Sequence, residues 1–201
     1  MKILQVIATV DMARKAEDAG VDGVIAVGTE GGGHVGRDEI TTLVLTRQVV
    51  KAVHIPVVAA GGIGDGCGWV AAYALGAEGI QMGTRFLATK ECPIPDAYKQ
   101  AILEAKDYST MIAARRGYPI RLLKNKAALK VWEMDERGAS QDEINAYVDA
   151  VSRDDSNDPE YKMMSAGQVA GLIDEIPTVE DLIRSMVAEA KAAAKTIGQQ
   201  F

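Results

Sequence analysis

Short apolar runs alternate with segments of helical spacing along the first part of the chain. The apolar runs cover residues 3–10, 23–27, 55–60 and 78–82, and helical spacing falls between them at 12–19, 41–52 and 66–75. Asp11 and Asp65 precede the first and third of these helices and are expected to cap them. Such alternation predicts parallel strands joined by crossover helices, an α/β fold. Because the runs are continuously apolar, we expect both faces of the sheet to be covered.

The pattern changes after about residue 89, where Pro93 and Pro95 mark a loop. The later apolar positions predict helices at 97–105, 120–132, 141–151, 166–173 and 178–197. Thr178 and Asp181 are close to a capping box for the last helix. The polar, acidic stretch 152–159 predicts an exposed loop. We therefore expect two parts, 1–92 and 93–201, with the second mostly helical and packed on the first.

Composition narrows the class of protein. The chain has 201 residues, a formal net charge of -6 and 48% hydrophobic residues, of which few are aromatic, so we expect one globular domain with an aliphatic core and at most an appendage. The acidic balance argues against nucleic acid and anionic membranes as partners. No apolar run is long enough to span a bilayer and no signal-peptide pattern is present, so we expect a cytoplasmic protein.

Candidate chemistry begins with a loop that follows the second apolar run. It reads Gly-Thr-Glu-Gly-Gly-Gly-His-Val-Gly over residues 28–36 and contains His34, one of two histidines in the chain. Glycines leave room for a ligand beside the imidazole. His34 can act as a general acid or base, can donate a hydrogen bond to a ligand, or can be a solvent-facing loop residue.

Two further glycine turns follow strands, at Gly61-Gly62 and at Gly83-Thr84. Backbone N–H groups at such turns, together with a helix N-terminus, bind anions, and glycine lets a phosphate approach the amides. In (β/α)₈ barrels the phosphate site commonly lies in the loops after the last two strands. The alternative is that these glycines only make tight turns. No frame of residues 61–68 matches the dinucleotide-binding fingerprint G-x-G-x-x-G.

The other polar residues and the cysteines are mostly expected to lie outside the candidate site. Glu30 is expected to be a solvated loop acid, and His54 a surface residue. Arg85 either approaches a phosphate or forms a salt bridge with a nearby acid. Cys67 and Cys92 stand in unrelated contexts and are interpreted as two reduced thiols. Neither the cysteines nor the histidines have metal-ligand spacing, so no metal site is expected.

The histidine loop resembles that of the nitronate monooxygenase family, formerly 2-nitropropane dioxygenase, which includes the FMN-dependent enoyl-acyl-carrier-protein reductase II. The resemblance starts with Val-Ile-Ala-Val before the loop and covers almost the whole chain. It continues through residues 56–63 (Pro-Val-Val-Ala-Ala-Gly-Gly-Ile) and 76–86, then 117–121 (Gly-Tyr-Pro-Ile-Arg) with Asn125, and finally 165–168 (Ser-Ala-Gly-Gln).

This resemblance implies a TIM barrel that holds FMN non-covalently. It implies that the flavin phosphate rests on Gly61, Gly62, Gly83 and Thr84, and that Gly32, Gly33 and the catalytic residue His34 lie against the flavin and substrate. Gln48 matches a family glutamine near the cofactor. NAD(P)H is the reductant in the reductase branch. By the same resemblance, residues 1–92 form a partial (β/α) barrel with the phosphate site.

Two departures from the family pattern stand out. Val27 takes a place where relatives often carry Glu or Gln next to the flavin. The chain also begins at what resembles the fifth strand of the eight, so it corresponds to the C-terminal half of a (β/α)₈ barrel followed by a helical appendage. Four parallel strands leave two open edges. We therefore expect a fragment, a second polypeptide that completes the barrel, or pairing of two identical halves.

Four functions follow as hypotheses. The first is an FMN-dependent oxidoreductase that oxidises alkyl nitronates with oxygen, with a small molecule as substrate. The second is NAD(P)H-dependent reduction of an enoyl-acyl carrier protein. The third is an inactive barrel fragment. The fourth is another phosphate-binding barrel, such as the IMP dehydrogenase group, which would require a catalytic cysteine loop that neither cysteine provides.

Overall fold

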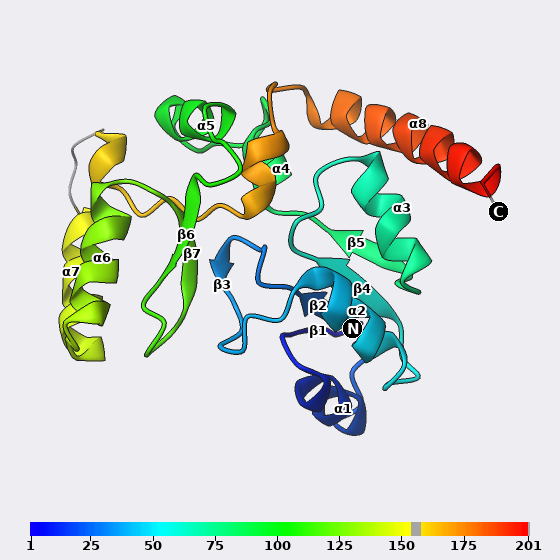
Figure 1. Cartoon of the computed structure of the whole chain (residues 1–201), viewed down its shortest axis with the longest axis horizontal. Coiled ribbons are helices and arrows are strands. Elements are labelled where there is room, and N and C mark those ends of the chain that lie inside the picture. Colours follow the sequence, from blue (N-terminus) through cyan, green and yellow to red (C-terminus); the bar gives the residue numbers. More distant parts are fainter. Residues whose placement is uncertain (154–157, 201) are drawn as a thin grey trace.

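The computed structural model of the chain describes residues 1–153 and 158–200. Its centre is a sheet of four parallel strands in the order β1-β2-β4-β5, which follows their order along the chain (Figure 1). The strands are β1 (Leu4–Ile7), β2 (Gly23–Val27), β4 (Val57–Ala60) and β5 (Gly79–Gln81). The helices α1 (Val10–Asp18), α2 (Thr42–Val50) and α3 (Gly66–Ala74) connect them. The α/β fold expected from the alternation is therefore confirmed.

The core between the sheet and its helices is aliphatic. Val24 and Ala26 of β2 are fully buried and pack in one cluster with Leu45 and Val49 of α2. Ala72 of α3 is buried in a second cluster that covers β4 and β5. Small and β-branched residues at these positions let the helices lie close to the strands.

Two details of the predicted elements are wrong. The first helix begins at Val10, because the hydroxyl of Thr9 accepts a hydrogen bond from the N–H of Met12 and so makes Thr9 the cap, where Asp11 was expected. The sheet is also covered unevenly. Strand β2 is buried along its first four residues, whereas three of the four residues of β1 are exposed. Asp65 does cap α3, through the N–H of Gly68.

The second part of the chain is less helical than predicted. It contributes the hairpin of β6 (Thr110–Ala113) and β7 (Ile120–Leu123), and β7 also pairs antiparallel with the short β3 (Gly33–His34). The predicted helix 120–132 is wrong at its start. Asn125 caps a separate helix, α6 (Lys126–Glu136), by accepting a hydrogen bond from the N–H of Ala128.

The remaining elements surround this hairpin and the end of the sheet (Figure 1). They are α4 (Thr84–Leu87), α5 (Asp96–Leu103), α7 (Gln141–Arg153), α8 (Val179–Gly198) and the 3₁₀ turns η1 (Pro159–Tyr161) and η2 (Gln168–Leu172). The predicted helix 166–173 is thus a short 3₁₀ turn, and the hydroxyl of Thr178 caps α8. Of the predicted exposed loop 152–159, residues 154–157 lie outside the described residues. The division at residue 92 stays a prediction.

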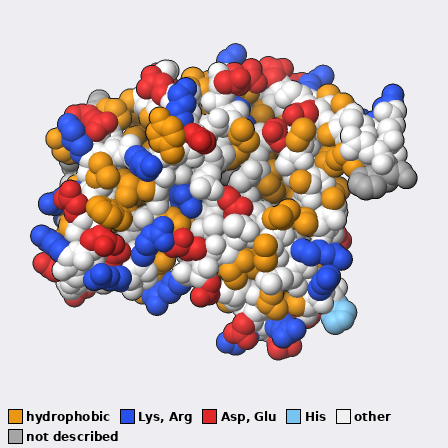
Figure 2. Space-filling model, viewed as in Figure 1, with side chains coloured by type: hydrophobic (Ala, Val, Ile, Leu, Met, Phe, Trp, Pro, Cys, Tyr) orange, Lys and Arg blue, Asp and Glu red, His pale blue; other side chains and the backbone are white. Residues whose placement is uncertain are grey.

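Acidic and basic side chains are intermixed over the face of the molecule drawn in Figure 2, with apolar groups between them. None of the helices in the described ranges is both long and apolar enough to cross a membrane.

Candidate functional site

A cavity of about 300 Å³ lies where the carboxyl ends of the four parallel strands meet. This end of a parallel sheet is where ligands bind in α/β proteins, because loops from several strands converge there. Its lining comes from Val6 near the end of β1, from the last residues of β2, β4 and β5, from both glycine turns, from the histidine loop and from the segment that leads into η2. It comprises Val6, Val27, Gly31, Gly32, His34, Ala60, Gly61, Gly62, Ile63, Gln81, Met82, Gly83, Thr84, Leu87, Ser165, Gly167 and Val169.

The two glycine turns present unpaired backbone N–H groups at the cavity. Gly61 and Gly62 adopt φ values of 92° and 71°, a region that favours glycine. A Cβ placed on Gly83 would meet no atom within 4 Å, so the backbone there is open to a ligand. The N–H groups of Gly62, Gly83 and Thr84 have no acceptor within residues 1–153 and 158–200. Such amides beside an open cavity are suited to an anion.

The side chain of Thr84 has a different partner from its N–H group. Its hydroxyl accepts a hydrogen bond of 2.9 Å from the N–H of Gly167, and both residues are at the cavity wall. The hydroxyl therefore holds the segment before η2 against the second glycine turn. The N–H group of Thr84 remains unpaired at the cavity.

His34 lies in β3, opposite Ile120 of β7, and its side chain is exposed at the cavity. The imidazole ring meets the Tyr118 ring edge-on, with 6.4 Å between centroids and 78° between planes. Strand pairing therefore fixes the backbone of His34, while its ring stays accessible to a substrate.

Of the other predicted site residues, Gly32 and Gly33 lie at or beside the cavity and Gln48 does not. Gly32 lines the cavity, and Gly33 lies beside it with φ of 78° and no atom within 4 Å of a built Cβ. Gln48 does not belong to the cavity, because it lies on an exposed face of α2, away from the strand ends. The expectation that Gln48 contacts the cofactor finds no support in this position.

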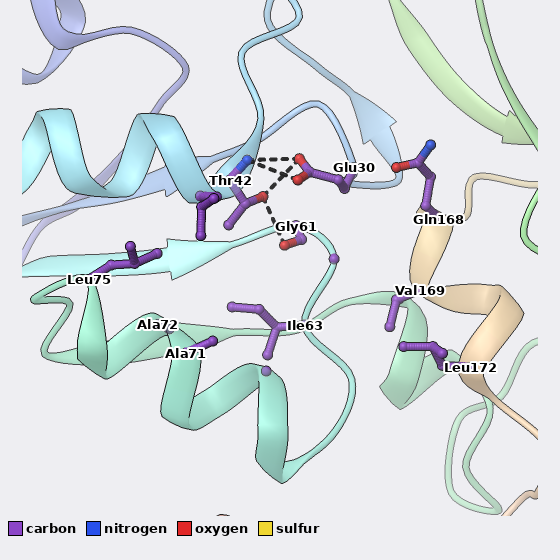
Figure 3. Close-up of a pocket in the computed structure, with 13 residues that line it drawn as sticks. Glu30, Thr42, Gly61, Ile63, Ala71, Ala72, Leu75, Gln168, Val169 and Leu172 are labelled. Carbon is purple, nitrogen blue, oxygen red and sulfur yellow. Dashed lines mark hydrogen bonds between the residues drawn. The ribbon is translucent and has the colours of Figure 1, made fainter. Parts of the chain in front are cut away.

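Glu30 is not the solvated acid that the sequence suggested. Its carboxylate accepts hydrogen bonds from the N–H of Thr42, at 2.9 and 3.0 Å, and from the Thr42 hydroxyl at 2.9 Å (Figure 3). Glu30 thus caps α2, whose expected capping position, Thr41, makes no side-chain bond. The Thr42 hydroxyl also lies 2.9 Å from the carbonyl oxygen of Gly61. This network fastens the histidine loop to the first glycine turn.

Arg85 takes neither of the two expected roles. Its guanidinium is buried and donates to the carbonyl oxygens of Ala88 and Glu175, at 3.0 and 2.7 Å. Burial lowers the pKa of this group, while Glu175 and Asp174 raise it. Arg85 therefore stabilises the turn after α4 and its contact with the chain beyond η2.

The segment 165–168 is the part of the site that residue-level reasoning missed. A Cβ on Gly167 would lie 2.6 Å from the carbonyl oxygen of Glu30, and one on Gly32 would lie 2.6 Å from the Gly167 nitrogen. The N–H of Gln168 donates to the Glu30 carbonyl at 2.9 Å. Glycine at both positions is thus required by the close approach of two backbones. Gly167, between Ala166 and Gln168, was the available signal in the sequence.

Comparison with known proteins identifies the group to which this site belongs. Residues 1–189 match the family described as nitronate monooxygenase. The chain belongs to the nitronate monooxygenase family. A probable nitronate monooxygenase of Staphylococcus saprophyticus is 35% identical over 202 residues, which cover 94% of this chain and 57% of that protein.

Two further proteins similar to this chain carry other names. A (3aS,4S,5R,7aS)-5-hydroxy-7a-methyl-1-oxo-octahydro-1H-indene-4-carboxyl-CoA dehydrogenase of Rhodococcus jostii is 32% identical and covers 92% of this chain. The structure of FabK from Thermotoga maritima superposes with a TM-score of 0.93 at 40% identity, covering 100% of this chain and 64% of that one. The fold is thus of the TIM-barrel type, and the chain spans less than two thirds of the length of these relatives.

Proposed function

We propose that this chain carries the phosphate-binding turns and the histidine loop of an FMN-dependent oxidoreductase of the nitronate monooxygenase type, which oxidises alkyl nitronates with oxygen. One observation carries the proposal: His34 and both glycine turns line a single cavity of about 300 Å³. Family membership and the relative of that name support it.

The residues at the cavity fit a flavin mononucleotide. The free N–H groups of Gly62, Gly83 and Thr84 would hold the phosphate, and the open backbone at Gly33 would leave room for the ring system beside Gly32. When bound, the flavin supplies the redox chemistry. His34 holds or moves a proton at its imidazole nitrogens beside the substrate. Val27, at the end of β2, presents an apolar wall.

The cofactor assignment is tested by FMN uptake, measured by absorbance and fluorescence titration of the purified chain. Gly83→Val adds a side chain at an open site that has an ordinary φ, so we expect unchanged folding and at least about tenfold weaker FMN binding. Gly198→Val, also at an open site but near the end of α8, is the matched control and should bind FMN like the wild type. A chain that stays colourless and takes up no FMN would favour the inactive fragment.

The reaction assignment is tested by oxygen uptake with an alkyl nitronate. His34→Asn should lower kcat by about 10²- to 10⁴-fold, the range typical of a lost general acid or base, and should leave FMN binding unchanged. Equal rates for the variant and the wild type would remove His34 from the catalytic role.

The second candidate function is NAD(P)H-dependent reduction of an enoyl thioester. The similarity to FabK supports it, and so does the similarity to a protein named as a carboxyl-CoA dehydrogenase, whose name contains a thioester. Consumption of NAD(P)H with a crotonyl thioester, in the absence of oxygen uptake with nitronates, would establish this function in place of the first.

A further inference from the structure

Tyr118 contacts the imidazole of His34 from outside the cavity at the strand ends. The two rings meet edge to face, with 6.4 Å between centroids and 78° between planes. Aromatic rings prefer this arrangement, at centroid distances of about 4.5–7 Å. His34 lines the cavity and Tyr118 does not. Any effect of Tyr118 on a ligand in this cavity therefore passes through His34.

The backbone holds both rings in register. His34 lies opposite Ile120 in the pairing of β3 with β7. One residue further on, the N–H of Val35 donates to the carbonyl oxygen of Pro119 at 3.1 Å. A proline restricts the residue before it to extended backbone, and here that residue is Tyr118. The phenol ring is thus carried beside a paired strand, one turn of the pleat from the imidazole.

The contact uses the ring of Tyr118 and not its hydroxyl. Within residues 1–153 and 158–200, the hydroxyl of Tyr118 has no hydrogen-bond partner. The residue is 63% exposed, so few other contacts depend on it. Phenylalanine at this position keeps the edge-to-face pair, and leucine removes it. The chain therefore offers a pair of variants that separates the ring from the hydroxyl.

The orientation of the imidazole matters for proton transfer. A general acid or base works only within hydrogen-bond reach of the atom that it protonates or deprotonates, and a misplaced group loses rate. The side chain of His34 is exposed and makes no hydrogen bond with another described residue. The ring of Tyr118 is thus the contact in the described ranges that limits rotation of the imidazole.

We propose that Tyr118 is a positioning residue, whose ring holds the imidazole of His34 in the orientation that faces the cavity. This inference rests on the proposed function, because it assigns a partner to the same acid or base. It makes the tip of the β6–β7 hairpin, which lies far from the glycine turns in sequence, a part of the proton-transfer machinery.

The contact itself is tested without cofactor or substrate, by nuclear magnetic resonance of the histidine ring protons. The chain contains only His34 and His54, so His34→Asn assigns both sets of signals and His54 is the internal reference. The current in the Tyr118 ring displaces the His34 signals. Tyr118→Leu should move them toward the position of an exposed histidine, and Tyr118→Phe should leave them displaced. Unchanged His34 signals in Tyr118→Leu would overturn the proposal.

The functional consequence is tested by oxygen uptake with an alkyl nitronate. Tyr118→Leu should lower kcat by about three- to tenfold, the range that the strength of such ring pairs allows, with little change in KM or in FMN binding. Tyr118→Phe should retain kcat close to that of the wild type. Tyr108→Leu removes a tyrosine of similar exposure, 70%, that does not line the cavity, and is the matched control. Equal losses in the two leucine variants, or in Tyr118→Leu and Tyr118→Phe, would refute the role of the ring.

A double variant shows whether Tyr118 acts through His34. In the His34→Asn background, Tyr118→Leu should cause no further loss of kcat, because the group that it positions is already absent. A full additional loss would contradict positioning.

The failure of this inference and the failure of the proposed function give different results. A chain that takes up FMN and loses activity in His34→Asn, but not in Tyr118→Leu, refutes the positioning role alone. A chain that oxidises nitronates equally well without His34 refutes the catalytic role of His34, and the role of Tyr118 with it, although the displaced His34 signals would remain.

Discussion

At the scale of single residues, Glu30 is an acidic loop residue whose carboxylate stabilises the fold by capping α2. The glycines around it allow the loop to fold back onto the start of α2, where the carboxylate takes the place of a helix cap. The same carboxylate is linked through Thr42 to the carbonyl of Gly61, so one side chain connects three segments of the site.

We expect Glu30→Ala to lower the free energy of unfolding by about 1–2 kcal/mol, because the N–H of Thr42 loses its acceptor. Glu30→Gln should cost less, since the amide oxygen still accepts one bond. Urea unfolding measures both. Asp18→Ala, an exposed acid of α1, is the control and should change stability by less than about 0.5 kcal/mol. Equal effects at Glu30 and Asp18 would contradict the capping role.

Cys67 is a second residue whose behaviour the surroundings determine. Its thiol donates a hydrogen bond to the Glu189 carboxylate at 3.6 Å, and this bond, with desolvation and the charges of Glu189 and Asp65, raises the pKa of the Cys67 thiol. The thiol therefore stays protonated to higher pH than an ordinary cysteine. The thiolate is the reactive form, so Cys67 should react slowly.

Glu189→Gln removes the charge but keeps an acceptor for the N–H of Gly66, so α8 should stay in place. We expect the pKa of Cys67 to fall toward its usual value, and its alkylation by iodoacetamide to become faster at pH 8 to 9. Peptide mass spectrometry separates this site from Cys92, which serves as the internal reference. An unchanged pH profile for Cys67 would show that the carboxylate does not control it.

At the scale of elements, the pairing of β3 with β7 decides where His34 lies. Arg121 of β7 reinforces this pairing: its Nε donates to the carbonyl oxygen of Thr29 at 2.8 Å and its Nη1 to the Thr110 hydroxyl at 3.1 Å. The side chain is almost fully buried. Burial lowers the pKa of Arg121, and the charges of Glu30 and Glu39 partly offset this effect. One cation thus joins the hairpin to the histidine loop.

Arg121→Met should lower the free energy of unfolding by about 2–4 kcal/mol, because it leaves the Thr29 carbonyl and the Thr110 hydroxyl without their donor. Arg121→Lys keeps the charge but cannot reach both acceptors from one planar group, so we expect an intermediate loss. Chemical denaturation followed by circular dichroism measures the effect. Arg116→Met, at an exposed position, is the control, and a comparable loss there would refute the bridging role.

At the scale of the whole molecule, the open sheet is the main feature. Strands β1 and β5 each pair with one neighbour among the described residues, and β1 leaves Leu4 and Val6 exposed for 52% and 47% of their surface. Unpaired strand edges with apolar side chains promote association. The expectation of a second half-barrel or a second copy along this sheet stays a prediction.

We expect the isolated chain to self-associate in a concentration-dependent way, because burying the β1 edge removes apolar area from water. Light scattering after size exclusion measures this association. Val6→Lys should shift the chain toward monomer, whereas Leu129→Lys, at a comparably exposed position of α6, should not. A monomeric wild type at high concentration would rule out association through this edge.

Predictions from the sequence were correct where an element depends on neighbouring residues, and less so where it depends on residues distant in sequence. The four parallel strands and the cap at Asp65 follow from local patterns and are confirmed. The cap at Thr9 was missed because a hydroxyl and a carboxylate near one helix start are equally good candidates. Strand β7 was missed because its apolar positions were assigned to a helix over 120–132, and no element was predicted for β6 at 110–113. The pairing of β7 with residues 33–34 is non-local.

The sequence by itself therefore determined the α/β class, the family resemblance and the glycine turns with His34 as a candidate site, because these depend on short-range patterns of residues. Only the tertiary structure decided that both turns and His34 share a cavity, that Glu30 caps α2, that Gln48 lies elsewhere and that the segment 165–168 closes the site. Those outcomes depend on which segments, distant in sequence, approach each other in space. The local sequence of one segment carries no signal of where its distant partner lies.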